Sequence, residues 1–139
     1  MKTLTVFTPT YNRAHTLTRV YESLCRQTCK DFEWLVVDDG STDDTRELVQ
    51  GFIADNKIGI KYIYKENGGL YTGYNTAYLN IKTELNVCVD SDDFMPDDAV
   101  ELIVNEWKQR GSDKYAGLLG LDFYAGTDTP IAGYFPEEL

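Results

Sequence analysis

The sequence predicts an α/β fold in which helices flank a mostly parallel sheet. Strand-like apolar runs alternate with helix-like segments along the chain, and the connections between them are short. A chain of 139 residues with 42% hydrophobic and 26% charged residues has the size and composition of one globular domain. Because strand and helix alternate, the strands are expected to run parallel and to be joined by right-handed helical crossovers.

Four strands are expected, each an apolar or β-branched run that stops at polar residues. Their ranges are residues 4–8, 32–37, 58–64 and 85–89. The first is expected to end at Pro9, because proline interrupts a strand. The second and fourth consist almost entirely of apolar residues, which is typical of interior strands in a parallel sheet.

Four helices are expected between and after these strands. They cover residues 15–27, a segment capped by Asp43 or Thr42 that continues through Ile53, residues 71–81, and residues 96–110. Pro96 suits the first turn of the last helix, where Asp97 and Asp98 would complement the helix dipole. After residue 117 the pattern loosens, and no repeat or linker divides the chain, so residues 1–139 are expected to form a single domain.

Composition excludes several classes of protein. No apolar run approaches the roughly 20 residues that span a bilayer, and no signal peptide pattern opens the chain, so a cytoplasmic location is expected. The net charge of −10 falls entirely on residues 66–139, and no basic stripe exists to bind nucleic acid. Three cysteines and one histidine argue for free thiols and against a zinc site.

The strongest functional signal is the position of four polar clusters, each directly after a predicted strand. They are residues 8–13, 38–42, 67–69 and 90–93. Ligands of open parallel sheets bind at the carboxyl ends of the strands. We therefore expect these four loops to form one binding edge.

Asp90, Ser91 and Asp92 follow the fourth strand. If the extended backbone continues, the two carboxylates lie on one side and Ser91 on the other. Carboxylates placed in this way suit Mg²⁺ or Mn²⁺, which prefer oxygen ligands and leave positions open for phosphates. The alternative is a solvated acidic turn that caps the next helix.

The other loops each allow a binding and a purely structural interpretation. Asp38 or Asp39 could accept hydrogen bonds from a ribose or a base, or simply belong to a turn that caps the next helix. Asn67, Gly68 and Gly69 could let the backbone approach a diphosphate closely, or form an ordinary loop.

Competing motifs fail in detail. The chain has no GxxxxGK[ST] phosphate loop and no GxGxxG dinucleotide motif. Residues 90–101 match a calcium-binding EF-hand loop only in part, because Met95 stands where glycine is needed. A haloacid dehalogenase phosphatase would place its DxD motif near the first strand rather than the fourth.

Taken in order, the loops resemble those of family 2 glycosyltransferases, which have the Rossmann-like GT-A fold. The resemblance lies in residues 9–13 (PTYNR), residues 36–43 (VVDDGSTD), residues 67–69 (NGG) with Asn75, and residues 89–93 (VDSDD) with Pro96. It covers roughly residues 3–110. The family transfers a sugar from a nucleoside diphosphate donor to an acceptor, usually with inversion and with Mg²⁺ or Mn²⁺. A UDP-sugar is the donor expected for this chain.

The resemblance also implies roles for individual residues. Pro9 and Tyr11 would frame the nucleobase, and Asp39 would contact the base or the ribose. Asp90 would lie beside the ribose and the metal, and Asp92 would be the chief metal ligand. The remaining residues that match the donor site are Asn67, Gly68, Gly69 and Asn75.

Two departures from the family pattern shape the expectations. Gly73 and Tyr74 precede Asn75 where many members have a small residue and an arginine. Members are also usually longer than 200 residues, so we expect this chain to be the nucleotide-sugar-binding part of a longer enzyme, with the general base beyond Leu139.

The acceptor is expected to be a glycan or a lipid-linked molecule, with peripheral association at the inner face of the membrane as one possibility. Two other interpretations stay open. One is a module that binds a nucleotide sugar without turnover. The other is a nucleotidyltransferase on a similar sheet, although its Gly-rich, Arg-containing loop after the first strand is absent.

Overall fold

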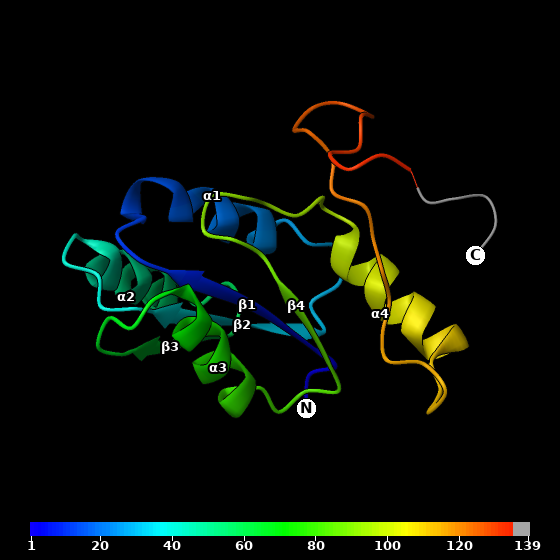
Figure 1. Cartoon of the computed structure of the whole chain (residues 1–139), viewed down its shortest axis with the longest axis horizontal. Coiled ribbons are helices and arrows are strands. Elements are labelled where there is room, and N and C mark those ends of the chain that lie inside the picture. Colours follow the sequence, from blue (N-terminus) through cyan, green and yellow to red (C-terminus); the bar gives the residue numbers. More distant parts are fainter. Residues whose placement is uncertain (135–139) are drawn as a thin grey trace.

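The computed structural model describes residues 1–134, in which strands and helices alternate as the sequence predicts. In chain order the elements are β1 (Leu4–Thr10), α1 (Ala14–Cys25), β2 (Phe32–Asp38), α2 (Thr45–Asp55), β3 (Ile60–Tyr64), α3 (Leu70–Asn80), β4 (Leu85–Cys88) and α4 (Ala99–Arg110). The strands form one parallel sheet with the order β3-β2-β1-β4 (Figure 1). The predicted α/β class with a parallel sheet is therefore confirmed.

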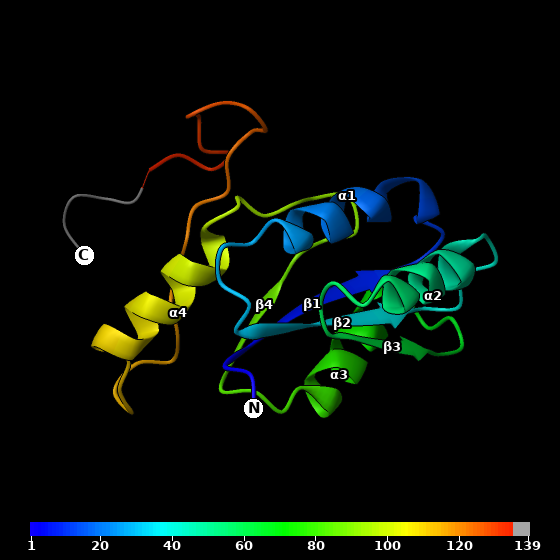
Figure 2. The ribbon, with the colours of Figure 1, turned by 180° about the vertical axis from the view of Figure 1, so that it is seen from behind.

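The core has two unequal parts on the two faces of the sheet. The larger part lies under α1, α2 and α4 and is centred on Trp34, whose ring stacks with Tyr21 and packs near Phe52. The smaller part lies under α3 and contains Phe7, Leu35, Val37 and Ala77. Figure 2 shows the sheet from behind, with β1 and β2 in its interior.

The prediction that Pro9 ends the first strand was wrong, because β1 continues to Thr10. The Phe7 carbonyl accepts a hydrogen bond from the Val89 amide, so the backbone polar groups of Phe7 point toward β4. Two residues later, the backbone of Pro9 points to the same side. The last residue of β4 is Cys88, which pairs with Phe7. Pro9 therefore lies beyond the end of the β4 ladder, where an N–H group has no strand to bond.

Two other expectations were also wrong. The fourth strand is not interior: β4 lies at the edge of the sheet and is only half-buried. An apolar run does not reveal how many neighbours a strand has. The last helix begins at Ala99 rather than at Pro96, because residues 96–99 form a turn in which the Ala99 amide donates to the Pro96 carbonyl.

After α4 the described chain, up to residue 134, contains only an isolated bridge between Phe123 and Pro130. Figure 1 shows this segment running back along α4, where Tyr115 and Leu118 meet Trp107 around a cavity. In the described part of the chain, no helix is long and apolar enough to cross a membrane.

Candidate functional site

The loops that follow β1, β2 and β3 are hydrogen-bonded to one another at the carboxyl edge of the sheet. The Asp39 amide donates to the Thr10 carbonyl over 2.9 Å, and the Lys65 amide donates to the Asp38 carbonyl over 2.9 Å. These bonds continue the strand pairing past the strand ends. The sequence prediction that the loops share one edge is confirmed for these three.

Asn12 joins the loop after β1 to the loop after β2. Its side-chain oxygen accepts hydrogen bonds from the amides of Thr42, at 2.8 Å, and Asp43, at 3.2 Å. The backbone amide of Asn12 donates to the Ser41 hydroxyl at 2.9 Å. Asn12 has a left-handed backbone with a φ of 51°, a conformation that asparagine tolerates better than most residues.

Asp43 binds the first amides of two helices. Its carboxylate accepts hydrogen bonds from Ala14, which starts α1, and from Thr45, which starts α2. Burial alone would raise the pKa of Asp43, but the bonds from Thr45 and Ala14 outweigh it and lower the pKa below its usual range. The sequence predicts Thr42 or Asp43 as the cap of the second helix; Asp43 does bind the Thr45 amide, but the residue at the N-cap position of α2 is Asp44.

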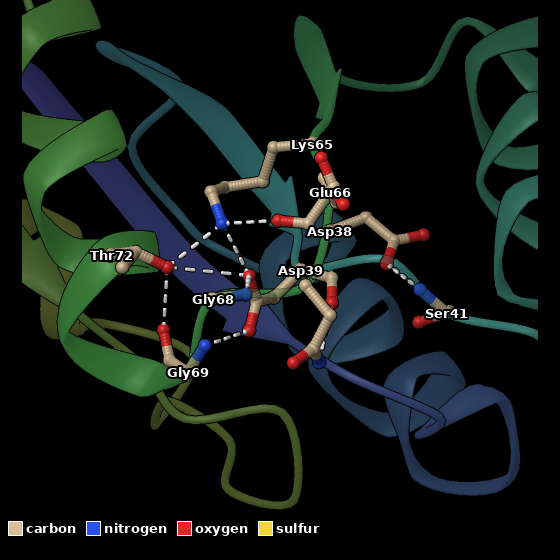
Figure 3. A network of polar contacts seen from close by, with 9 residues as sticks. Asp38, Asp39, Ser41, Lys65, Glu66, Gly68, Gly69 and Thr72 are labelled. Carbon is tan, nitrogen blue, oxygen red and sulfur yellow. Dashed lines mark hydrogen bonds and ion pairs between the residues drawn. The ribbon is translucent and has the colours of Figure 1, made fainter.

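Asp39 holds the loop that precedes α3 (Figure 3). One carboxylate oxygen accepts hydrogen bonds from the Gly68 amide at 3.0 Å and from the Lys65 ammonium at 2.5 Å. The other accepts from the Gly69 amide at 2.9 Å. Lys65 also donates to the Thr72 hydroxyl at 2.8 Å, so this ion pair ties β3 and α3 to the end of β2.

This arrangement keeps Asp39 ionised. Burial is the largest influence and would raise the pKa of Asp39, but the bonds from Lys65, Gly68 and Gly69 lower it below the ordinary value of 3.8. The residue is only 5% exposed, and both oxygens are turned inward. The predicted contact of Asp39 with a base or ribose stays a prediction; what the structure shows is a carboxylate that positions the 67–69 loop.

At Gly40 the loops after β2 and β3 approach each other closely. Its φ is 83°, and a Cβ atom there would lie 2.7 Å from the Asn67 amide nitrogen. Asn67 in turn donates from its side chain to the Asp39 carbonyl at 2.9 Å.

Asp38 has a structural role. It is fully buried, and its carboxylate accepts hydrogen bonds from the Ser41 amide and the Tyr62 hydroxyl.

The acidic residues after β4 form a turn. The Asp93 amide donates to the Asp90 carbonyl at 3.1 Å, so the expected extension of the backbone through Asp92 does not occur. Ser91 is buried, while Asp90 and Asp92 are exposed. Burial and the charges of Asp92, Asp90 and Asp122 raise the pKa of Asp93, as expected where carboxylates crowd.

The acidic turn fits a divalent cation in its chemistry. Within residues 1–134, no group of three or more His, Cys, Asp or Glu side chains forms a ready-made metal cage. Mg²⁺, however, is commonly held by one or two carboxylates together with the phosphates of a substrate. Asp90 and Asp92 are two exposed carboxylates of the kind that such a site uses.

The remaining predicted site residues are Pro9 and Tyr11, in and after β1, and Asn75, on α3. Gly73 lets α3 approach β1 closely, since a Cβ atom there would lie 3.3 Å from the Pro9 Cβ. Tyr11 is 48% exposed just beyond β1, and Asn75 is exposed on α3. Neither of their side chains makes a hydrogen bond within the described residues.

Tyr74 takes the place of the arginine that many family members carry. Its ring packs edge-on against Phe7, and the Cys88 thiol lies 3.4 Å from its hydroxyl and 3.7 Å from an Asp90 oxygen. The hydrogen bond with Cys88 and burial both raise the pKa of Tyr74 above its usual range. The residue therefore connects α3 to the start of the acidic turn without supplying a positive charge.

Three residues that organise this edge were not among the predicted site residues. Lys65 lies next to a predicted loop, which was the available signal. Asn12 stands inside the first motif and was quoted only as part of it. Arg19 lies on α1 and donates to the Asp92 carbonyl at 2.7 Å, and nothing in its local sequence marks that contact.

The chain matches the family described as "Glycosyl transferase family 2" over residues 5–131. It is also 36% identical over 106 residues to the chondroitin synthase of Escherichia coli. That match covers 76% of this chain and 15% of the synthase. The chain thus spans a small part of the length of this relative.

Solved structures of glycosyltransferases are also similar to this chain. The TarS 1-349 fragment of S. aureus in complex with UDP-GlcNAc has a TM-score of 0.74 and 32% identity, over 81% of this chain and 33% of that one. The mannosyltransferase PcManGT of Pyrobaculum calidifontis, in complex with GDP-Man and Mn²⁺, has a TM-score of 0.70 and 26% identity, over 76% of this chain and 32% of that one. Fold and family comparisons agree, and this chain belongs to glycosyl transferase family 2, with the GT-A fold.

Proposed function

We propose that this chain binds the nucleotide-sugar donor of a metal-dependent glycosyltransferase, with a UDP-sugar as the donor. The transfer is to a glycan or a lipid-linked acceptor and inverts the anomeric carbon. A lipid-linked acceptor would bring the enzyme to the inner face of the membrane as a peripheral protein.

The observation that carries this proposal is the likeness to TarS, which has been solved with UDP and with UDP-GlcNAc. The edge formed by the loops after β1, β2 and β3 supports it, because this is where parallel sheets bind nucleotides. A relative named chondroitin synthase is consistent with a glycan acceptor.

The residues of this edge suggest how a donor would lie. Pro9 and Tyr11 would frame the nucleobase, with the exposed Tyr11 ring as a stacking surface. Asp39 would contact the base or ribose from the same network that fixes the loop of Asn67, Gly68 and Gly69. The backbone of that loop and Asn75 would lie beside the diphosphate.

Asp90 and Asp92 would hold Mg²⁺ or Mn²⁺ at the acidic turn. A bound cation supplies charge neutralisation for the diphosphate that leaves the sugar. Asp90 would also lie beside the ribose. The acceptor hydroxyl must lose its proton to a carboxylate base in such a displacement, and no residue of this chain is assigned that role.

Calorimetry with UDP tests the donor assignment. UDP is expected to bind in the presence of Mn²⁺ or Mg²⁺ and to lose most of its affinity in a chelator, because exposed carboxylates repel a bare diphosphate. GDP and ADP serve as competitors for base preference. Equal affinity for UDP with and without the chelator would exclude the metal role.

The Asp92→Asn variant tests the metal ligand. It is expected to abolish metal-dependent UDP binding while the fold stays intact or becomes slightly more stable, since one of several crowded negative charges is removed. Asp113→Asn is the matched control, because it removes the same charge from an exposed residue after α4. Undiminished metal-dependent binding by the Asp92→Asn variant would refute the assignment.

A second candidate is a module that binds a nucleotide sugar without transferring it. It is favoured by the segment after α4, which within residues 111–134 contains no helix or strand on which an acceptor site would be built. A coupled assay for nucleoside diphosphate release, with and without acceptors, separates the two candidates.

A further inference from the structure

One face of α1 runs alongside the backbone that follows β4. Arg19, Ser23 and Gln27 are spaced four residues apart, so they form a stripe along the helix and just past its end. Each contacts a successive part of residues 92–100. The helix thus fixes the path of the chain from the acidic turn to α4.

The two inner contacts of this stripe are buried. The Ser23 hydroxyl accepts a hydrogen bond from the Met95 amide at 3.3 Å. Gln27 accepts from the Val100 amide at 2.9 Å and donates to the Pro96 carbonyl at 2.6 Å. Ser23 is 0% and Gln27 2% exposed, so both belong to the core and their loss would disturb the whole fold.

The outer contact is different, because Arg19 is exposed and reaches the acidic turn itself. Its guanidinium donates to the Asp92 carbonyl at 2.7 Å and lies 5.5 Å from the centre of the Phe94 ring. Among the ion pairs formed within residues 1–134, none joins Arg19 to a carboxylate. The positive side chain therefore holds the backbone of the turn and leaves the Asp92 carboxylate unpaired.

We propose that Arg19 is a positioning residue that holds the Asp90–Asp93 turn in its cation-binding shape. This inference rests on the proposed function for its cation, but the contact itself can be tested separately. In the absence of a cation, three neighbouring carboxylates repel one another and tend to open the turn. A cationic donor on the Asp92 carbonyl opposes that opening without occupying the carboxylate.

The positive charge of Arg19 allows two possible roles to be distinguished by the direction in which cation affinity changes. If Arg19 acted only as a nearby positive charge, its removal would strengthen cation binding, because like charges repel. If it positions the turn, its removal weakens cation binding. The two possibilities predict opposite results for the metal alone.

The experiment compares the Arg19→Ala and Arg19→Lys variants of the full chain with Arg46→Ala. Arg46 is the matched control, since its guanidinium also lies over an aromatic ring, that of Tyr64, at 4.2 Å and away from the turn. Mn²⁺ binding without nucleotide is measured by electron paramagnetic resonance. Hydrogen exchange is measured at the Asp93 and Met95 amides, which bond within and beside the turn.

In the Arg19→Ala variant, exchange at these two amides is expected to become roughly fivefold to tenfold faster, as one charge-assisted hydrogen bond is lost. Mn²⁺ affinity is expected to fall by a similar factor. Arg19→Lys, which keeps a cationic donor, is expected to restore most of both effects. Arg46→Ala is expected to change neither.

Three outcomes would overturn the inference. Unchanged exchange in Arg19→Ala would show that Arg19 does not hold the turn, and stronger Mn²⁺ binding would show that it acts only through charge. A loss of UDP affinity with unchanged exchange and unchanged Mn²⁺ binding would make it a direct nucleotide contact. If wild-type protein binds neither Mn²⁺ nor UDP, the proposed function fails, and the exchange result still decides whether Arg19 holds the turn.

Discussion

Two aspartates of the loop after β2 accept hydrogen bonds from backbone amides at the starts of helices. Asp39 accepts hydrogen bonds from the amides of Gly68 and Gly69, directly before α3. Asp43 accepts hydrogen bonds from the first amides of α1 and α2. A helix start carries free N–H groups and a partial positive charge, so a carboxylate there is stabilising. Two side chains of one loop thus orient the starts of three helices at the candidate site.

The ion pair between Lys65 and Asp39 is expected to matter for stability. Its two side chains are 20% and 7% exposed. Lys65→Met leaves a buried carboxylate without a positive partner, bonded only to two backbone amides and the Thr72 hydroxyl. We expect the variant to lose about 1–3 kcal/mol of free energy of unfolding. Urea denaturation checks this value.

Lys57→Met is the control for that measurement. It breaks a pair with Asp55 in which both side chains are more than half exposed, and it should change stability by less than about 1 kcal/mol. Equal effects of the two substitutions would show that the Asp39 network contributes nothing beyond a surface ion pair.

The lowered pKa of Asp39 predicts how this contribution depends on pH. Since the folded pKa lies below the ordinary 3.8, the stabilisation is fully present above that value and is lost as pH falls through the folded pKa. Wild type should therefore be more stable than Asp39→Asn at pH 7, and the difference should shrink below pH 3.8. Urea denaturation of both proteins across this range is the measurement, and a difference independent of pH would contradict the assignment.

At this scale the sequence predicts residue types at the edge better than their partners. Asp39 and Asp92 follow strand-like runs, so their position at the edge can be predicted from order alone. Their partners Lys65 and Arg19 are 26 and 73 positions away, and such contacts leave no periodic signal in a single sequence.

Among the elements, all eight were predicted in type and order, and the differences lie at their ends. Apolar periodicity reports which face of an element is buried, whereas an end depends on what lies beside it. Pro9 stays in β1 because β4 has already ended, and Gly59 precedes β3 although it lies within the predicted strand. Such neighbours become known only once the sheet is assembled.

Gly40 is the point at which two loops constrain each other, and it gives a test at this scale. Gly40→Ala would introduce both an unfavourable backbone at a φ of 83° and a Cβ atom 2.7 Å from the Asn67 nitrogen. We expect a loss of about 2 kcal/mol or more of free energy of unfolding.

Gly51→Ala in α2 is the matched control, because a Cβ atom there meets nothing within 4 Å. Alanine favours a helix, so this variant should be more stable by about 0.5–1 kcal/mol. The two substitutions are chemically identical, so opposite signs in urea denaturation would assign the difference to the loop contact. A small effect of Gly40→Ala would mean that the loops can separate at little cost.

In the whole molecule the candidate site consists of two parts with different supports. The loops after β1, β2 and β3 are joined to one another through Asn12, Asp39 and Lys65. The acidic turn after β4 is held instead by Arg19 of α1. A nucleotide diphosphate with its cation would contact both parts, and so would couple them.

This division predicts that donor binding and sugar transfer separate in this chain. The proposed function assigns donor-side roles to residues of this chain and assigns none of them the role of general base. We therefore expect the 139-residue chain to bind UDP and Mn²⁺ yet to transfer sugar very slowly. Loss of a general base typically lowers a rate by about 10²–10⁴-fold, and loss of acceptor positioning lowers it further.

A coupled assay for released UDP, on this chain alone and with candidate acceptors, measures the separation. Slow hydrolysis by water fits the expectation, because a donor held only from its nucleotide side leaves the sugar open to solvent. Asp92→Asn, which is expected to bind no cation, is the control for background release. Acceptor-dependent turnover near the 1–10³ per second usual for enzymes would contradict the prediction, since it would require an acceptor site and a base within these 139 residues.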